Sequence, residues 1–219
     1  MRLLLVIPAR LASKRLAEKN LQRIGDHTLL GNAVVIAKAA RAPDEVWVNT
    51  ADEALAAEGW GFGARLYARN PALASDDTRT HEIMVDFVRA HPCDWLVAFN
   101  PTSPLVRPQT IDRFCAALRA DACDTLVSVR PVRTHLLSET LYPLNFVPHL
   151  DPRTQDLPTV YAAAWALMGW RGATLAAGGG TWGGRVRAFV LPDDEAVDID
   201  TQGDLDYARY LYDRRACGH

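Results

Sequence analysis

Short apolar runs alternate with longer amphipathic stretches along the whole chain. Runs rich in Val and Leu predict buried strands, and stretches with apolar positions three and four apart predict helices. The strands are expected at Leu3–Pro8, Glu45–Thr50, Asp94–Phe99, Thr125–Val132, Ala163–Met168 and Arg187–Leu191. The helices are expected at Leu29–Ala40, Asp52–Trp60, Thr80–Ala90, Pro108–Ala120 and about Gln202–Arg214. This alternation is typical of the α/β class, with a Rossmann-like, mostly parallel sheet sandwiched by helices.

One segment, residues 133–160, interrupts the alternation. Five prolines lie in it or just before it: Pro131, Pro143, Pro148, Pro152 and Pro158. Proline removes a backbone donor and ends regular elements, so we predict an excursion from the sheet. Such an excursion is either a lid over a substrate or an arm that pairs two subunits. Because no repeat or linker divides the chain, residues 1–219 are expected to form one domain.

Composition and charge narrow the possible functions. Hydrophobic types make up 49% of the chain, charged types 23%, and the formal net charge is -2, which excludes a disordered chain and a basic surface for nucleic acid. A small phosphorylated ligand, held by local cations, fits better. The four cysteines form no C-x-x-C pair, which argues against structural zinc. The same observation favours a protein of the reducing cytoplasm. The apolar runs fall short of a secretory signal and of the roughly 20 residues that a membrane span requires.

The loop after the first strand gathers positive charge. Ile7–Asn20 contains four cations within ten residues: Arg10, Lys14, Arg15 and Lys19. Such a loop can surround a triphosphate, because cations neutralise charge that backbone amides alone cannot; the alternative is a solvated charged surface. Neither G-x-x-x-x-G-K-[ST] nor G-x-G-x-x-G follows the strand, which argues against P-loop NTPases and dinucleotide dehydrogenases.

Two acids near the end of the chain have the spacing of a metal site. Asp198 and Asp200 project to one face of an extended segment, while Ile199 turns toward the core. Paired carboxylates suit Mg²⁺, which usually completes its shell with phosphate oxygens and waters. The alternative is that the acids only cap the next helix, where Thr201 and Asp204 form a T-x-x-D capping box.

Six segments, in order along the chain, together resemble one family. They are Ile7–Asn20 (IPARLASKRLAEKN), Val48–Glu53 (VNTADE), Arg69–Thr80 (RNPALASDDTRT), Asn100–Arg107 (NPTSPLVR), Arg153–Tyr161 (RTQDLPTVY) and Val197–Leu205 (VDIDTQGDL). They resemble the signatures of the CMP-sialic acid synthetase (acylneuraminate cytidylyltransferase) family, which activates acidic 2-keto-3-deoxy sugars. The resemblance implies a fold of the nucleotide-diphospho-sugar transferase type, with residues 133–160 as a dimerisation arm.

The same resemblance implies roles for individual residues. Those expected to bind the nucleotide are Arg10, Ser13, Lys14, Lys19, Asn20, Arg69 and Thr80. Those expected to bind the acceptor are Asn100, Thr102, Ser103, Arg107, Gln155 and Tyr161. Arg10, Lys14 and Asp200 are expected to be catalytic, with Asp198 and Asp200 holding Mg²⁺. Two alternatives remain from the residues themselves: Asp76 and Asp77 as caps of the following helix, and the PTSP stretch as a proline-stiffened turn.

The departures from the family pattern fall on the acceptor side. Asn100 replaces a Gln, Val106 is inserted before Arg107, and Ala164 and Trp165 replace an Asn-Gly pair. A buried Trp with fewer amides disfavours an acceptor whose acetamido group needs hydrogen bonds, so the activated sugar need not be N-acetylneuraminate. Gly178–Gly184 (GGGTWGG) predicts a flexible loop.

The expected function is a Mg²⁺-dependent transfer of CMP from CTP to the anomeric hydroxyl of an acidic sugar, with release of pyrophosphate. No nucleic-acid or membrane partner is expected, and the expected assembly is a homodimer. Two alternatives remain. One is a catalytically silent nucleotide-binding or interaction protein of the same fold, and the other is a CMP transferase that acts on a different acid acceptor.

Overall fold

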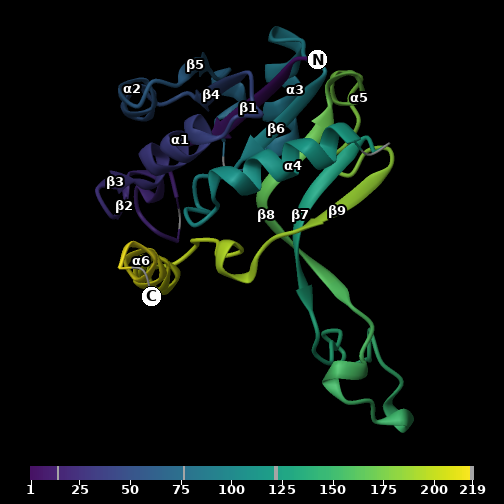
Figure 1. Cartoon of the computed structure of the whole chain (residues 1–219). Helices are drawn as coiled ribbons and strands as arrows, with labels where there is room; N and C mark the ends of the chain where they lie inside the picture. Colours follow the sequence, from purple (N-terminus) through teal and green to yellow (C-terminus); the bar gives the residue numbers. More distant parts are fainter. Residues whose placement is uncertain (14, 76, 121–122, 218–219) are drawn as a thin grey trace.

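The computed structural model describes residues 1–13, 15–75, 77–120 and 123–217, and a central sheet organises them (Figure 1). Its seven strands lie in the order β5-β4-β1-β6-β8-β7-β9. Their bounds are β1 Leu3–Pro8, β4 Glu45–Thr50, β5 Arg65–Ala68, β6 Trp95–Phe99, β7 Thr125–Val132, β8 Val160–Arg171 and β9 Val186–Val190. Only β8 runs antiparallel to its neighbours β6 and β7. The predicted mostly parallel α/β architecture is therefore confirmed.

Helices cover both faces of this sheet. Their bounds are α1 Leu29–Ala39, α2 Glu53–Gly61, α3 Thr80–Ala90, α4 Pro108–Ala120, α5 Gly172–Ala176 and α6 Gln202–Ala216. A small second sheet pairs β2 (Arg23–Ile24) with β3 (His27–Thr28). None of the helices within the described ranges is long and apolar enough to cross a membrane.

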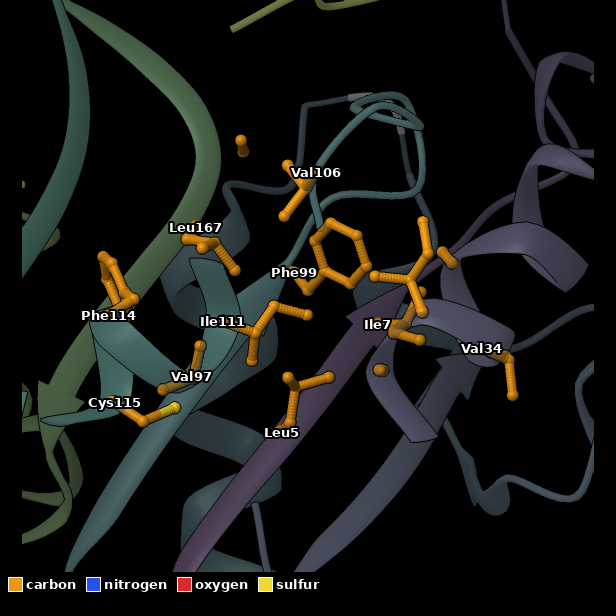
Figure 2. Close-up of a cluster of buried hydrophobic side chains, with 14 of the residues drawn as sticks. Leu5, Ile7, Val34, Val97, Phe99, Val106, Ile111, Phe114, Cys115 and Leu167 are labelled. Atoms are coloured by element: carbon orange, nitrogen blue, oxygen red, sulfur yellow. The ribbon is translucent and has the colours of Figure 1, made fainter. Parts of the chain in front are cut away.

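Alternate residues of the central strands bury opposite faces. Leu3, Leu5 and Ile7 of β1 lie in one core cluster with side chains of α1, α2 and α4, and Figure 2 shows part of this cluster. Leu4 and Val6 lie in another cluster with side chains of α3 and α5. A strand buried on both sides reads as a continuous apolar run, which is why β1 was visible in the sequence.

Most elements begin and end where the sequence predicted. β1, β4, β7, α3 and α4 have the predicted bounds, and the other predicted elements differ by a few residues at their ends. β8 differs most, because it extends from Val160 to Arg171 instead of covering only Ala163–Met168. β5 was not predicted, because its mostly exposed residues carry no apolar run.

The proline-rich segment leaves the body of the molecule, as predicted. Val129–Val132 of β7 and Val160–Ala163 of β8 pair as a ribbon, and the segment beyond it projects away from the sheet (Figure 1). Two short 3-10 helices, Pro148–Leu150 and Thr154–Asp156, lie in it. Residues 133–160 together with Tyr161 are called the arm below.

Candidate active site

A cavity of about 680 Å³ opens where the carboxyl ends of β1 and β6 meet the loops that follow them. In an open α/β sheet this edge is the usual place for a ligand. The predicted site residues that line it are Arg10, Ser13, Lys19, Asn20, Arg69, Thr80, Asn100, Thr102, Asp198 and Asp200. Segments far apart in the sequence therefore meet in one place. Lys14 lies outside the described residues, as does Asp76.

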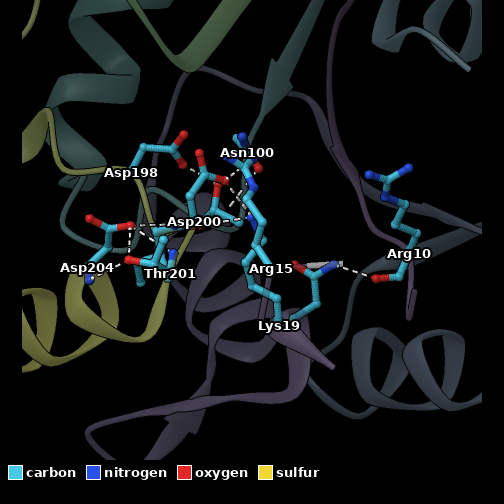
Figure 3. A network of polar contacts seen from close by, with 11 residues as sticks. Arg10, Arg15, Lys19, Asn100, Asp198, Asp200, Thr201 and Asp204 are labelled. Atoms are coloured by element: carbon cyan, nitrogen blue, oxygen red, sulfur yellow. Dashed lines mark hydrogen bonds and ion pairs between the residues drawn. The ribbon is translucent and has the colours of Figure 1, made fainter. Parts of the chain in front are cut away.

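The cationic loop contacts the acidic segment directly. Arg15 donates to Asp200 at 2.6 Å, and the Lys19 Nζ lies 3.1 Å from the same oxygen and 2.8 Å from the Ile199 carbonyl oxygen. Figure 3 shows Arg15 and Lys19 on Asp200, with Arg10 apart from this group. The charges segregated along the sequence are thus paired across the cavity.

Asp198 and Asp200 have the predicted orientation, although their segment is not a strand. Both line the cavity, while Ile199 between them is fully buried. The Ile199 amide donates to the Thr102 carbonyl, and the Thr102 hydroxyl donates to Asp198 at 2.5 Å. Burial, with a further contribution from Asp200, raises the pKa of Asp198. Because the negative charge of Asp200 is felt by Asp198, a cation bound between the two carboxylates and a ligand would be favourable.

The capping interpretation also holds, one residue further on. The Thr201 hydroxyl accepts from the Asp204 amide, and the Asp204 carboxylate accepts from the Thr201 amide at 2.8 Å. This capping box starts α6, so Thr201 and Asp204 cap the helix while Asp198 and Asp200 stay available to the cavity. At α3 the cap is Arg79, whose amide donates to Glu82. Asp77 is therefore not the cap.

Arg69 joins two segments of the chain at the wall of the cavity. Only 5% of it is exposed, and its Nε and Nη2 donate to the side chain and backbone of Asn49 and to the Ala9 carbonyl. Burial lowers the pKa of Arg69 to about 10, so the guanidinium keeps its charge at neutral pH. Arg69 ties the end of β4 to the start of the cationic loop, and it adds a positive charge at the cavity wall.

Asn20 leaves one buried acceptor for a ligand. Its Nδ2 donates to the Arg10 carbonyl at 2.8 Å, while its Oδ1 is buried without a hydrogen-bond partner among the described residues. A buried unsatisfied polar atom costs about 1 to 3 kcal/mol. Because Asn20 lines the cavity, a ligand hydroxyl or amino group would satisfy this oxygen.

Four of the predicted acceptor residues are not brought to this cavity. Ser103 is 1% exposed and lies within the turn after β6. Arg107 binds Glu195 at 3.2 Å and Asp194 at 2.6 Å, so the guanidinium expected to bind the acceptor pairs with carboxylates of its own chain. The inserted Val106 is buried in the core beside Phe99 (Figure 2) instead of reaching the acceptor side. Gln155 and Tyr161 lie exposed on the arm.

Sequence reasoning placed Trp165 on the acceptor side, and this residue of β8 lines the cavity. It missed Ala98 of β6, Met168 of β8 and Ile83 of α3, and it gave no role to Ser75 and Thr78, which also line the cavity. Ser75 and Thr78 lie in the quoted Arg69–Thr80 segment, so that signal was present in the sequence. Ala98 and Met168 are partners across the antiparallel β6–β8 pair, and no local pattern predicts that register. Trp165 is 45% exposed, so it is not the buried Trp that was expected.

The donor set at the cavity suits a hard cation. Asp198 and Asp200 present carboxylate oxygens at one wall, and the described residues hold no cluster of three or more His, Cys, Asp and Glu side chains. Mg²⁺ is usually held by one or two carboxylates and takes its other ligands from phosphate and water. The two acids fit that pattern and do not fit a four-ligand zinc site.

A doubly wound sheet with a cationic loop after its first strand and paired acids at the same edge is the architecture of a nucleotidyltransferase. The chain belongs to the cytidylyltransferase family, whose sequence profile matches residues 4–145.

Curated relatives place the chain within this family. It is 24% identical over 212 residues to N-acylneuraminate cytidylyltransferase A of Danio rerio, covering 92% of this chain and 48% of the relative. It is 32% identical over 127 residues to 3-deoxy-manno-octulosonate cytidylyltransferase of Myxococcus xanthus, covering 58% of this chain and 50% of the relative. It is 30% identical over 138 residues to CMP-N,N'-diacetyllegionaminic acid synthase of Legionella pneumophila, covering 60% and 59%. The chain thus spans about half the length of these relatives.

Solved structures share the fold. A CMP:2-keto-3-deoxy-manno-octonic acid synthetase complexed with CTP matches with a TM-score of 0.76 at 18% identity, covering 98% of this chain and all of that one. A 4-diphosphocytidyl-2C-methyl-D-erythritol synthase from Anaerococcus prevotii matches with a TM-score of 0.70 at 10% identity, covering 97% and 96%.

Proposed function

We propose that this chain transfers CMP from CTP to the anomeric hydroxyl of an acidic 2-keto-3-deoxy sugar. One observation carries the proposal. A single cavity is lined by Arg10, Arg15 and Lys19, by Asp198 and Asp200, and by Asn20, whose Oδ1 is buried without a hydrogen-bond partner among the described residues. A nucleoside triphosphate needs cations for its phosphates, acids for its metal ion and an acceptor for its hydroxyls. The relatives named above carry the names of enzymes that act on such sugars.

The chemistry is a displacement at phosphorus. The acceptor oxygen attacks the α-phosphorus of CTP, the bond to the β-phosphate oxygen breaks, pyrophosphate leaves, and the hydroxyl proton passes to solvent. In this proposal Arg10, Ser13, Lys14 and Lys19 hold the phosphates, and Asn20, Arg69 and Thr80 hold the nucleoside. Arg10, Lys14 and Asp200 are the proposed catalytic residues. The chain contributes mainly position and charge neutralisation, as expected for phosphoryl-type transfer.

Asp198 and Asp200 are the residues that would hold Mg²⁺. When bound, the ion supplies charge neutralisation at the α-phosphate and lowers the pKa of the attacking hydroxyl. Thr102 keeps Asp198 in place, and Lys19 keeps Asp200 in place. Asn100 and Thr102, at the end of β6, are the proposed contacts for the acceptor in this chain.

A homodimer is the proposed assembly, supported by the apolar surface of the arm. Its exposed large side chains are Leu137, Leu141, Tyr142, Leu144, Val147, Leu150 and Tyr161. Such a set on one projecting segment is typical of an interface. A second subunit would also give Gln155 and Tyr161 a cavity to reach, since no arm residue lines the cavity of its own chain among the described residues. Light scattering on the eluting protein is expected to give twice the chain mass, and a monomer at micromolar concentration would contradict the dimer.

A cytoplasmic location is also proposed, because the four cysteines form no C-x-x-C pair and the thiols of Cys93 and Cys115 are free. Thiols are kept reduced in that compartment.

Pyrophosphate release tests the function. With CTP and Mg²⁺, a panel of 3-deoxy-manno-octulosonate, N-acetylneuraminate and N,N'-diacetyllegionaminate should include at least one acceptor that releases pyrophosphate. Asp200→Asn should lower kcat by about a hundredfold or more, since it removes one negative charge at the phosphates. The matched control Asp206→Asn, on the outer side of α6, should keep wild-type turnover. CTP binding without release for any acid would instead indicate a silent nucleotide-binding protein.

A further inference from the structure

Trp165 has an unusual backbone conformation for a strand residue. Its φ is 56°, in the left-handed region. Among the described non-glycine residues with a positive φ, it is the one that lies inside a strand. The others lie before a 3-10 helix or in the arm: Glu18, Leu141 and Asp151. For a bulky side chain this conformation is strained, and such strain concentrates at ligand-binding sites.

A large bulge in β8 produces this conformation. Val127 pairs with Met168 and Val129 with Ala163, so residues 164–167 of β8 face Ser128 alone on β7. The Ser128 hydroxyl accepts from the Leu167 amide at 2.9 Å. On the other side, the Asn100 amide donates to the Ala166 carbonyl at 2.9 Å. Hydrogen bonds to both neighbouring strands hold the bulge, and bulges beside active sites serve to re-aim a side chain.

The side chain aimed by this bulge is an indole at the cavity wall. Trp165 lines the cavity together with Ala98, Met168 and Ile83, and 45% of it is exposed. Its ring meets the ring of Trp182 edge to face, with centroids 5.5 Å apart and planes at 68°. Edge-to-face pairs of this geometry are attractive, so each ring helps to hold the other in place.

Trp182 comes from the glycine-rich loop, which is anchored on both sides of it. The Trp170 indole donates to the Thr181 carbonyl at 3.2 Å, and the Thr125 hydroxyl donates to the Gly183 carbonyl at 2.7 Å. A loop held at these two points keeps Trp182 against Trp165. Trp182 thus supports the orientation of Trp165 from outside the cavity.

The cavity therefore has a charged wall and an apolar wall. The cationic loop, Asp198 and Asp200 form the first, and Ala98, Met168, Ile83 and Trp165 form the second. Phosphates and their metal ion belong at the charged wall. The apolar wall borders Asn100, the proposed acceptor contact, so it faces the ring of the acceptor.

We propose that Trp165, supported by Trp182, is the residue that selects the acceptor, and that it favours sugar acids whose ring substituents are hydroxyl groups over those with acylamino groups. This rests on the proposed function. An indole packs against the C–H face of a sugar ring, while its edge hydroxyls remain in water. An acylamino group packed against Ala98, Met168 or Ile83 would find no hydrogen-bond partner on these side chains, which opposes its binding.

The test compares two acceptors in wild type and variants. Apart from the carboxylate that both acceptors share, 3-deoxy-manno-octulosonate carries only hydroxyl groups, whereas N-acetylneuraminate also carries an acetamido group. Wild type should prefer the first in kcat/KM by about tenfold or more. Trp165→Gly, which suits a positive φ, should reduce that preference to about threefold or less through KM for the acceptor, with KM for CTP unchanged. Trp165→Phe should keep most of it.

Two further variants separate the role of Trp165 from general damage. Trp182→Ala should lower the preference less than Trp165→Gly does, because the indole at the wall stays in place. Trp60→Ala, which removes a more exposed indole on α2, should leave the preference unchanged. Wild-type preference for the acetamido acceptor, or an unchanged ratio in Trp165→Gly, would overturn the proposal.

Binding without turnover distinguishes this proposal from the proposed function. Calorimetry with CMP in place of CTP measures the affinity for each acceptor when no transfer takes place. Trp165-dependent discrimination in binding, without pyrophosphate release from CTP, would support the acceptor role and contradict the transferase. Pyrophosphate release with equal binding of both acceptors in wild type would do the reverse.

Discussion

Thr102 connects the loop after β6 with the segment that carries Asp198 and Asp200. It is 5% exposed, its carbonyl accepts from the Ile199 amide, and its hydroxyl donates to Asp198. Burial raises the pKa of Asp198, and the Thr102 hydrogen bond opposes that rise. Thr102 therefore acts as a positioning residue for the acid beside it.

Removing this hydroxyl should impair turnover more than folding. Thr102→Val leaves the half-buried Asp198 without a donor, so we expect kcat for pyrophosphate release to fall about tenfold to a hundredfold. Thr102→Ser keeps the donor and should restore at least half of wild-type kcat. Equal turnover by the Val and Ser variants, measured at saturating CTP, would contradict a positioning role.

Helix α6 begins at a cap that also ends the acidic segment. The Thr201–Asp204 capping box starts the helix one residue after Asp200. The buried Leu205 and Ala208 then dock the helix against Ile199. A well-formed start of α6 thus holds the backbone that carries both acids.

Thr201→Ala should lower the free energy of unfolding by about 1 kcal/mol, because the Asp204 amide loses its acceptor. For a protein of this size the Tm should fall by about 2 to 4 °C in a thermal melt. The exposed Thr159→Ala should leave Tm unchanged. A Tm shift as large for Thr159→Ala would mean that the cap contributes nothing specific.

At the end of the sheet opposite the cavity, a cluster of charged side chains surrounds Glu45, the first residue of β4. Glu45 lies 2.7 Å from Arg2 and 3.2 Å from Arg65, and it accepts from the Trp47 indole. Its side chain is 18% exposed. The hydrogen bond from Arg2 is the main cause that lowers the pKa of Glu45.

This lowered pKa gives stability a defined pH dependence. A carboxyl with a depressed folded pKa stabilises above its unfolded pKa of about 4.3, and the contribution is lost as the pH falls through the folded pKa. Glu45→Gln should therefore lower the free energy of unfolding, measured with urea, by about 1 kcal/mol at pH 7. This loss should become smaller as the pH falls below 5. Glu139→Gln, an exposed change on the arm, is the control. A cost that grows toward acid pH would contradict this assignment.

At the scale of the whole molecule, the antiparallel direction of β8 determines the position of both the arm and the apolar wall of the cavity. The chain leaves along β7, turns in the arm and returns antiparallel along β8 between β6 and β7. The same strand then carries the bulge at Trp165. The arm thus leads directly into the strand that carries Trp165 to the apolar wall of the cavity, although the two serve different contacts.

Charging the arm should separate the subunits without unfolding them. Tyr142 and Leu144 are 71% and 62% exposed in the single chain, so Tyr142→Lys with Leu144→Lys removes little intramolecular packing. We expect light scattering to report the monomer mass, with an unchanged far-UV circular dichroism spectrum. Trp60→Lys, an equally exposed change on α2, should stay dimeric. A doubly charged arm that still elutes as a dimer would place the interface elsewhere.

The sequence by itself determined the positions of most elements, the cationic loop and the acid pair. Apolar periodicity and short motifs are local, so they remain readable without coordinates. Only the tertiary structure decided that Arg107 pairs with Glu195, that β8 is reversed, and that a bulge holds Trp165 half exposed with a positive φ. These outcomes depend on pairing between residues far apart in the chain, where one step of register moves a side chain to the other face of a sheet. The predictions for Lys14 and for one domain over residues 1–219 stay predictions.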